Sequence, residues 1–295
     1  MNNDKKHLSP FYIKLSNKLM KSIKSSVYFL PETKFKDMDL KIKNKWFIVG
    51  GATSGFGKAT AEKLLEEGAN VLAIARNEDA LRAFHSKYST KSKILAGDLT
   101  LPDTLLKLRN RFDLSEFTGA FINAGGPPAM RFMDTKLSDW DEAFKLIVRW
   151  KVDLTQMLIP FFIGNGYGKL VFVESVSVKQ PVENLVLSNS LRLAVVGFVK
   201  TLSQETAGTN ICMNIMAPGY HDTPAVQRVF RKKAELNGIS MEEAKESLVK
   251  NIPAGTMGNP DDFASLAVWL LSPLSDYING QTITVDGGGV KGSFG

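Results

Sequence analysis

Cysteine is almost absent from this sequence, and histidine is scarce. The single cysteine, Cys212, cannot form a disulfide within the chain, which is typical of a protein kept in a reducing compartment, and we expect a cytoplasmic location. The three histidines, His7, His85 and His221, are too scattered for the spacing of a metal site. Metal catalysis is therefore not expected.

Long apolar runs are also missing. No stretch has the length of a membrane span or of the apolar part of a secretory signal, so we do not expect an integral membrane protein. Hydrophobic residues nevertheless make up 44% of the 295 residues, which is enough for the core of one α/β domain.

The positive charge is concentrated at the N-terminus. Residues 1–37 carry eight lysines and three acidic residues, so the net charge of +7 divides into +5 for this segment and +2 for residues 38–295. Because so little of the charge belongs to the domain, a basic cleft for nucleic acid is not expected.

Apolar residues recur at every fourth position in this N-terminal segment. Together with the lysines between them they predict a basic amphipathic helix, whose apolar positions are Phe11, Leu15, Leu19, Ile23 and Val27. We expect this helical extension to dock on the protein's own surface. An anionic membrane surface and a targeting role are the alternatives.

A strand, a glycine turn and a helix follow one another after Lys45. The apolar run 46–49 predicts the strand, residues 50–57 the turn, and residues 58–67 a helix that ends at Gly68. Glycines permit positive φ and let backbone N–H groups approach a pyrophosphate at the helix N-terminus. A second buried strand, 69–76, completes a βαβ unit.

Polar residues follow two further predicted strands. Asp98 comes after the apolar run that begins at Ile94, and Asn123-Ala124-Gly125 comes directly after another. In open parallel sheets ligands bind beyond the carboxyl ends of the strands, so these residues point to one crevice. The predicted fold is a single α/β domain over residues 38–295, a Rossmann-type doubly wound parallel sheet of about seven strands flanked by helices.

Motifs spread over most of the chain resemble those of the short-chain dehydrogenase/reductase family. They are a GxxxGxG turn, an aspartate, an Asn-Ala-Gly run, a serine and two later segments, namely Gly51, Gly55, Gly57, Asp98, 123–125, Ser175, 218–223 and 285–288. The resemblance extends from Met38 to about Gly289. Because Met38 is similar to the usual start of the family, residues 1–37 form an optional extension in one alternative interpretation.

The resemblance implies a set of cofactor-binding residues. Gly51, Gly55 and Gly57 would shape the phosphate turn, Asp98 would meet the adenine, and Gly50 stands where the family usually has threonine. The full set is Gly51, Thr53, Ser54, Gly55, Phe56, Gly57, Arg76, Asn77, Asp98, Leu99, Asn123, Ala124, Gly125, Arg192, Pro218, Gly219 and Thr223.

The choice between NAD(H) and NADP(H) is made at the end of the second strand. An acidic residue there would accept the ribose hydroxyls of NAD, whereas a cation would receive the 2′-phosphate of NADP. This chain has Arg76, whose planar, permanently charged group suits a phosphate, so we favour NADP(H). In the alternative, Arg76 stacks on the adenine and both cofactors are usable.

The expected catalytic residues of the family are largely replaced. The family uses Asn, Ser, Tyr and Lys, and the resemblance places Ser175 at the serine position. Ser188 then stands at the tyrosine position, Arg192 at the lysine position and Ile147 at the asparagine position. The chain therefore resembles a divergent, oxoacyl-reductase-like subgroup with Ser-x-x-x-Arg in place of Tyr-x-x-x-Lys.

These replacements leave the proton donor open. Arg192 can anchor and polarise but cannot give up its proton, and Ser188 is a weak acid that more readily positions an oxygen. Water, Tyr220 and His221 are the alternative donors, because the latter two follow the segment that flanks the nicotinamide in this family. The catalytic candidates are Ser175, Ser188, Arg192 and Tyr220.

Two charged residues near these positions are expected to be structural. Strand alternation should point Glu174 to the face opposite Ser175, and Lys151, one helical turn after Ile147, is expected to be a solvated surface lysine.

Two functions are consistent with these residues. The first is an NADP(H)-dependent oxidoreductase that transfers hydride between nicotinamide and a carbonyl or alcohol, with a 3-oxoacyl compound as one candidate substrate. The second is a catalytically inactive nucleotide-binding sensor or scaffold protein. The resemblance also implies a mobile lid at about 221–252, a second substrate wall at 126–130, and a homo-oligomer that is a tetramer or a dimer.

Overall fold

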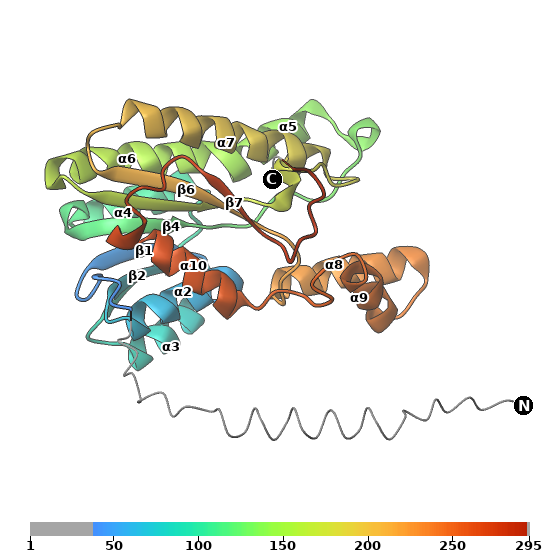
Figure 1. The fold of residues 1–295 in the computed structure, drawn as a ribbon, viewed down its shortest axis with the longest axis horizontal. Helices are drawn as coiled ribbons and strands as arrows, with labels where there is room; N and C mark the ends of the chain where they lie inside the picture. Colours follow the sequence, from blue (N-terminus) through green and yellow to red (C-terminus); the bar gives the residue numbers. More distant parts are fainter. Residues whose placement is uncertain (1–37, 294–295) are drawn as a thin grey trace, which may run out of the picture. The chain divides into compact units, whose positions relative to one another are not determined.

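Seven parallel strands form one sheet in the computed structural model, which describes residues 38–293. The order is β3-β2-β1-β4-β5-β6-β7 (Figure 1). The strands are β1 (Trp46–Gly50), β2 (Asn70–Ala75), β3 (Ser92–Ala96), β4 (Phe117–Ile122), β5 (Gly168–Val173), β6 (Ile211–Pro218) and β7 (Thr282–Val285). The predicted doubly wound α/β fold is confirmed, whereas the extension at residues 1–37 lies outside the described residues.

Helices cover both faces of the sheet (Figure 1). One face carries α2 (Gly55–Glu66), α3 (Glu78–Lys87) and α10 (Pro260–Leu270), and the other carries α4 (Pro102–Arg111), α6 (Trp150–Asn165) and α7 (Val186–Glu205). The remaining helical segments are η1 (Leu114–Glu116), η2 (Phe132–Asp134), α5 (Leu137–Phe144), the π-helical η3 (Lys145–Arg149), η4 (Val176–Val178), α8 (Pro224–Asn237), α9 (Met241–Val249) and η5 (Pro273–Ser275).

The predicted lid residues fold into α8 and α9, which have a small core of their own. Phe230 of α8 and Ala244 of α9 are buried against each other's helices, and Tyr220 packs against the same cluster. This pair stands at one end of the molecule in Figure 1.

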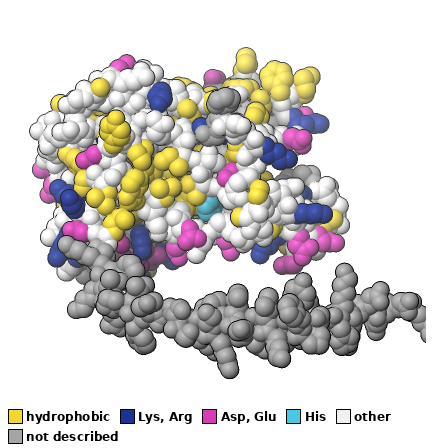
Figure 2. Space-filling view, viewed as in Figure 1, with side chains coloured by type: hydrophobic (Ala, Val, Ile, Leu, Met, Phe, Trp, Pro, Cys, Tyr) yellow, Lys and Arg dark blue, Asp and Glu magenta, His cyan; other side chains and the backbone are white. Residues whose placement is uncertain are grey.

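The sheet ends at β7, which pairs with β6 on one side. All four residues of β7 are half-buried, and Leu274 and Tyr277 are exposed in the segment before it. Figure 2 shows hydrophobic side chains gathered on the side of the molecule where Figure 1 places β7 and α10.

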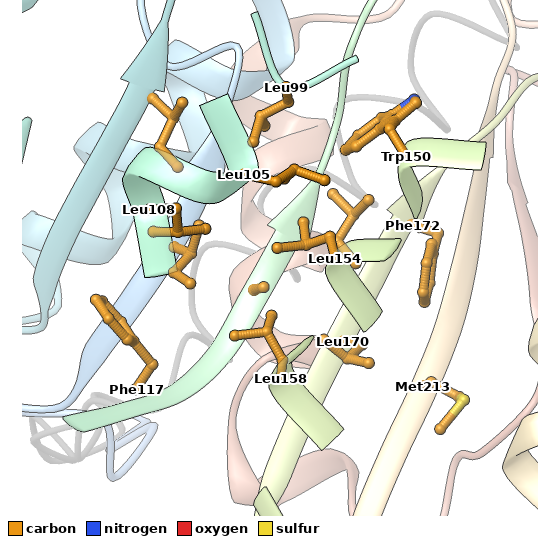
Figure 3. Close-up of a cluster of buried hydrophobic side chains, with 14 of the residues drawn as sticks. Leu99, Leu105, Leu108, Phe117, Trp150, Leu154, Leu158, Leu170, Phe172 and Met213 are labelled. Carbon is orange, nitrogen blue, oxygen red and sulfur yellow. The ribbon is translucent and has the colours of Figure 1, made fainter. Parts of the chain in front are cut away.

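Alternating side chains divide the core into two layers. Ile48 and Phe172 point towards α4, α6 and α7, while their neighbours Val49 and Val171 point towards α2 and α10. Figure 3 shows the first layer, in which leucines of α4 and α6 pack against Phe117, Leu170 and Phe172. Both faces of the sheet are thus buried, as expected for a parallel sheet.

The order in which strands are added to the sheet reverses between β1 and β4. The chain places β2 and β3 on one side of β1, and then places β4 to β7 on its other side. Parallel strands end at one edge, so the segments after β1 and β4 meet there. They meet closely, since a side chain on Gly50 would place its Cβ 2.6 Å from the backbone oxygen of Asn123. In this arrangement the backbone has no room for a side chain at Gly50. In the part of the chain that the structure describes, no helix has the length and apolarity of a membrane span.

Two leucines of α4 test the burial pattern. Leu108 has an exposed fraction of 0%, and Leu106 one of 56%. Leu108→Ala should lower the free energy of unfolding by about 2–5 kcal/mol because it leaves a cavity under the sheet. Leu106→Ala should change it by less than about 0.5 kcal/mol. Urea unfolding followed by circular dichroism measures both, and equal losses would contradict the burial assigned to this helix.

Candidate active site

A cleft of about 900 Å³ lies beyond the carboxyl ends of the strands. Most of the residues expected to bind the cofactor line it, namely Gly51, Thr53, Ser54, Gly55, Phe56, Arg76, Asn77, Asp98, Leu99, Asn123, Ala124, Gly125 and Thr223. Gly57, Arg192, Pro218 and Gly219 are not among its lining residues. Arg228 of α8 lines the cleft as well, so part of the predicted lid borders the same space.

The glycine turn brings backbone N–H groups to the cleft. A Cβ on Gly57 would lie 2.3 Å from the backbone oxygen of Gly51, so only glycine lets α2 pack this tightly onto the turn. The Ser54 side chain makes no capping hydrogen bond, and the first turn of α2 holds no acidic residue. The free N–H groups at this helix end, aided by the helix dipole, fit a phosphate.

Arg76 and Asp98, which follow β2 and β3, both line this cleft. The Arg76 side chain is 82% exposed, and its Nη1 lies 3.9 Å from Oδ2 of Asp98. Asp98 is held in place through Oδ1, which accepts hydrogen bonds from the backbone and the hydroxyl of Thr100. Within residues 38–293, Asp98 is the one ion-pair partner of Arg76, and it is distant enough to leave the guanidinium donors open to an anionic ligand.

Two expected cofactor residues also have structural roles. Asn77 caps α3, with its Oδ1 accepting from the backbone N–H of Ala80 at 2.9 Å. The ring of Phe56 packs 4.1 Å from that of Phe263, measured between ring centroids. Phe56 therefore anchors the start of α2 to α10 through its side chain.

Ser188 and Arg192 contact each other along one face of α7. Nε of Arg192 donates a hydrogen bond to Oγ of Ser188 at 2.9 Å, as their spacing of one helical turn allows. Ser188 is buried and Arg192 is half-buried. Ser175 follows β5, and its Oγ accepts a hydrogen bond from the backbone N–H of Ser177 at 3.2 Å.

Glu174 contacts Arg192, and Lys151 contacts Glu174. The sequence analysis did not predict either contact. Nη1 of Arg192 donates to Oε2 of Glu174 at 2.9 Å, and Nζ of Lys151 donates to Oε1. The expectation that Lys151 is a surface residue is wrong, since its exposed fraction is 3%. Burial lowers the pKa of Lys151, Glu174 opposes this shift, and Arg192 adds to it.

Glu174 continues the alternation of side chains along β5, but the expectation that it is only structural does not take its contact with Arg192 into account. The carboxylate does lie on the face covered by α6 and α7, and that is the face from which Arg192 approaches. The sequence does contain a signal for this contact. A carboxylate follows the buried run of β5, and a buried charge requires a partner.

Ile147 belongs to the core, with an exposed fraction of 1%. It lies in the π-helical turn η3, and the indole N–H of Trp150 donates to the backbone oxygen of Leu146 in this turn at 3.0 Å. The carbonyl of the widened turn is thus paired with a core tryptophan, and Ile147, expected from the resemblance to stand at the asparagine position, is packed in the core.

The two candidate proton donors after β6, like Ser175 and Ser188, are not among the residues that line the cleft, although His221 packs against the lining residue Phe56. Burial raises the pKa of Tyr220, which makes it a weaker acid, and its ring packs against the core of α8 and α9. His221 is buried, donates from Nδ1 to the backbone oxygen of Gly219 at 3.2 Å, and lies 5.0 Å from the ring of Phe56.

Arg192 is connected to the cleft through Gly126. A Cβ on Gly126 would lie 2.8 Å from Nη2 of Arg192, and Gly126 is a lining residue of the cleft. The wall 126–130 is tied to α7 by a hydrogen bond from the backbone N–H of Val186 to the backbone oxygen of Met130 at 3.4 Å. The charged network of α7 therefore borders the cleft edge.

Comparisons with known proteins find relatives that match most of the chain. A family model described as enoyl-(acyl carrier protein) reductase matches residues 51–289. The chain is 27% identical over 257 residues to 3-oxoacyl-(acyl-carrier-protein) reductase FabG of Aquifex aeolicus, covering 85% of this chain and 99% of that protein. It is 30% identical over 258 residues to dehydrogenase/reductase SDR family member 4 of Caenorhabditis elegans, covering 84% and 96%.

A solved structure shows the same arrangement of elements. L-sorbose reductase of Gluconobacter frateurii, in complex with NADPH and L-sorbose, matches with a TM-score of 0.79 at 27% identity. The match covers 86% of this chain and all of that chain.

The burial of His221 predicts a pH dependence of stability. Burial lowers its pKa below the ordinary 6.5, and the hydrogen bond to Gly219 opposes this shift. The unfolded chain then binds the proton at higher pH than the folded protein, so stability is present above about pH 6.5 and is lost as the pH falls through the folded pKa. The melting temperature should therefore fall from pH 7 to pH 5, and His221→Phe should reduce the fall.

His85→Gln controls for the loss of a histidine as such, because His85 is only half-buried and lies on α3. An identical pH dependence in His221→Phe and in the unsubstituted protein would show that another group causes the fall.

Proposed function

The chain belongs to the short-chain dehydrogenase/reductase family, and we propose that it is an NADP(H)-dependent oxidoreductase with a non-standard catalytic set. Hydride passes between the nicotinamide and the carbon of a carbonyl or alcohol substrate. The observation that carries the proposal is the cleft in which the free N–H groups of α2 and the Arg76 cation meet the polar residues that follow β3 and β4.

The cleft residues fit a dinucleotide phosphate. The turn at Gly51 and Gly57 leaves no room for side chains, and the helix end behind it offers unpaired donors. Arg76 supports the choice of NADP(H), because a 2′-phosphate would meet its exposed guanidinium beside the anchored carboxylate of Asp98. When bound, NADPH supplies the hydride, and the protein supplies binding and orientation.

Ser175, Ser188 and Arg192 carry the catalytic part of the proposal. Ser175 accepts a hydrogen bond from the Ser177 backbone, which leaves its own hydroxyl hydrogen to be donated, and the proposal assigns that hydrogen to the substrate oxygen. Arg192 supplies a fixed positive charge that stabilises negative charge on that oxygen. Water is the proton donor we favour, because Tyr220 and His221 are engaged in packing.

The substrate space is bounded by the loop 126–130 and by the lid formed by α8 and α9. Arg228 and the half-buried Lys233 belong to α8, and Arg228 lines the cleft. A carbonyl compound that carries a carboxylate or a phosphate suits this side of the cleft, and a 3-oxoacyl thioester bound to a carrier is one candidate. The similar 3-oxoacyl reductase and L-sorbose reductase support reduction of a carbonyl group as the reaction.

A homo-oligomer, either a dimer or a tetramer, is part of the proposal. The outer edge of β7 and the exposed side chains Leu274 and Tyr277 offer a surface for a second copy. The buried thiol of Cys212 is free, which supports a reducing compartment such as the cytoplasm.

Arg76→Ala tests the cofactor choice. Loss of a hydrogen-bonded charge pair of roughly 1.5–3 kcal/mol should weaken NADPH binding about tenfold to a hundredfold. NADH binding should change little, because NADH lacks the 2′-phosphate. Fluorescence titration measures both, and Arg82→Ala, which removes an exposed arginine of α3, is the control. A protein that prefers NADH before any substitution would contradict the proposal.

Ser175→Ala tests the reaction. With NADPH and a panel of ketones, aldehydes, oxo acids and oxoacyl thioesters, the unsubstituted protein should oxidise NADPH, as followed by absorbance. Ser175→Ala should lower the rate by at least about a hundredfold with NADPH affinity unchanged, because it removes a donor to the reacting oxygen. Unchanged turnover would contradict this role. Tight NADPH binding without turnover of any compound would support the inactive sensor or scaffold instead.

A further inference from the structure

Four polar side chains form one buried chain of contacts beside the cleft. Lys151 of α6 pairs with Glu174, Glu174 pairs with Arg192 of α7, and Arg192 donates to Ser188. The exposed fractions of the side chains are 4% for Lys151, 0% for Glu174 and 13% for Arg192.

The two contacts of Arg192 fix its guanidinium in two directions. Nη1 donates to Glu174 and Nε to Ser188, both at 2.9 Å, so the planar group cannot rotate without breaking one of them. An arginine side chain has considerable rotamer freedom in the absence of such partners. The carboxylate of Glu174 therefore determines where the positive charge lies.

The direction of the Ser188 hydrogen follows from its contact with Arg192. Since Oγ accepts the Nε–H hydrogen, the hydroxyl hydrogen is directed elsewhere. Among residues 38–293, no protein group accepts that hydrogen. Ser188 does not itself line the cleft, but its partner Arg192 reaches the cleft edge at Gly126, and the nearby charge of Arg192 strengthens the hydroxyl as a donor.

Lys151 completes the balance of charge around Glu174. A carboxylate without solvent contact requires partners for both oxygens, and Lys151 occupies the oxygen that Arg192 leaves free. Burial lowers the pKa of Lys151, while the Glu174 carboxylate favours its charged form. Lys151 thus holds Glu174 against α6, on the side opposite to Arg192.

We propose that Glu174 and Lys151 are positioning residues that fix Arg192, so that Ser188 offers its hydroxyl hydrogen to the substrate oxygen at the position where the family has tyrosine. The inference rests on the proposed function, because the acceptor is the carbonyl oxygen of the substrate. Ser188 donates a hydrogen bond to the oxygen on which negative charge develops and keeps its proton.

Glu174→Gln is the first test. A shift of about 1 Å in a positioned group costs roughly a hundredfold in rate, so kcat should fall about a hundredfold with a smaller change in KM. Lys151→Met should act in the same direction, and Lys151→Arg, which keeps the cation, should retain more activity. Glu183→Gln, which removes an exposed carboxylate before α7, is the control. Melting temperatures establish that each variant is folded.

A double-substitution cycle separates positioning from structural support. If Glu174 acts through Arg192, then Glu174→Gln should change kcat by less than about threefold in an Arg192→Lys background, because the group that it positions is gone. Independent effects that multiply in the double variant would assign Glu174 a structural role alone and overturn the proposal.

Gly126→Ala should displace the guanidinium of Arg192 while leaving every charged residue of the network unchanged. The added Cβ would lie 2.8 Å from Nη2 of Arg192, and Gly126 has no positive φ that would strain an alanine. It should lower kcat with little effect on the melting temperature. Gly197→Ala on α7, where the added Cβ would meet nothing within 4 Å, is the matched control. Equal kcat values in Gly126→Ala and Gly197→Ala would count against a fixed guanidinium.

An NMR measurement on the NADPH complex decides the proposal independently of turnover. The Nε–H signal of Arg192 should exchange slowly with water in the unsubstituted protein and at least tenfold faster in Glu174→Gln and Gly126→Ala. Fast exchange in the unsubstituted protein would overturn the positioning. The expected slow and fast signals, in a protein that reduces no carbonyl compound, would uphold the positioning of Arg192 and refute the proposed function.

Discussion

The parallel direction of all seven strands is the constraint on which the rest of the structure depends. Parallel neighbours cannot be joined by tight turns, so each connection crosses over a face of the sheet, and both faces become buried. Every carboxyl end then lies on one edge. The glycine turn after β1, the aspartate after β3 and the asparagine after β4 meet there although they are far apart in the sequence.

The cleft at this edge combines two kinds of electrostatic group. Backbone N–H groups at the start of α2 and the exposed Arg76 offer positive potential in contact with solvent, where a phosphate keeps part of its hydration. Behind the cleft edge, Arg192 is held by a carboxylate without solvent contact. A charge fixed in this way needs no reorganisation when the charge of a reacting oxygen changes.

The charged side chains beside Ser188 come from three elements of the fold. Glu174 and Lys151 provide a buried ion pair that the permanently charged Arg192 joins, and Ile147 lies in the nearby core. A buried ion pair is weak evidence for stability, because desolvation offsets much of the attraction. Its value here lies in the orientation that it gives to Arg192.

The fold and the cleft follow from local patterns in the sequence. Apolar runs of strand length, glycines between a strand and a helix, and polar residues at strand ends predict a doubly wound sheet and the edge where a cleft forms. The resemblance to the family, counted onward from Ser175, singled out Ser188 and Arg192. Tertiary structure alone decided their partners, because Lys151, Glu174 and Arg192 come from three elements whose side chains meet only when α6 and α7 pack on β5. It likewise placed Tyr220 and His221 in packed cores, since the sequence places both after β6 but does not determine which neighbours bury them.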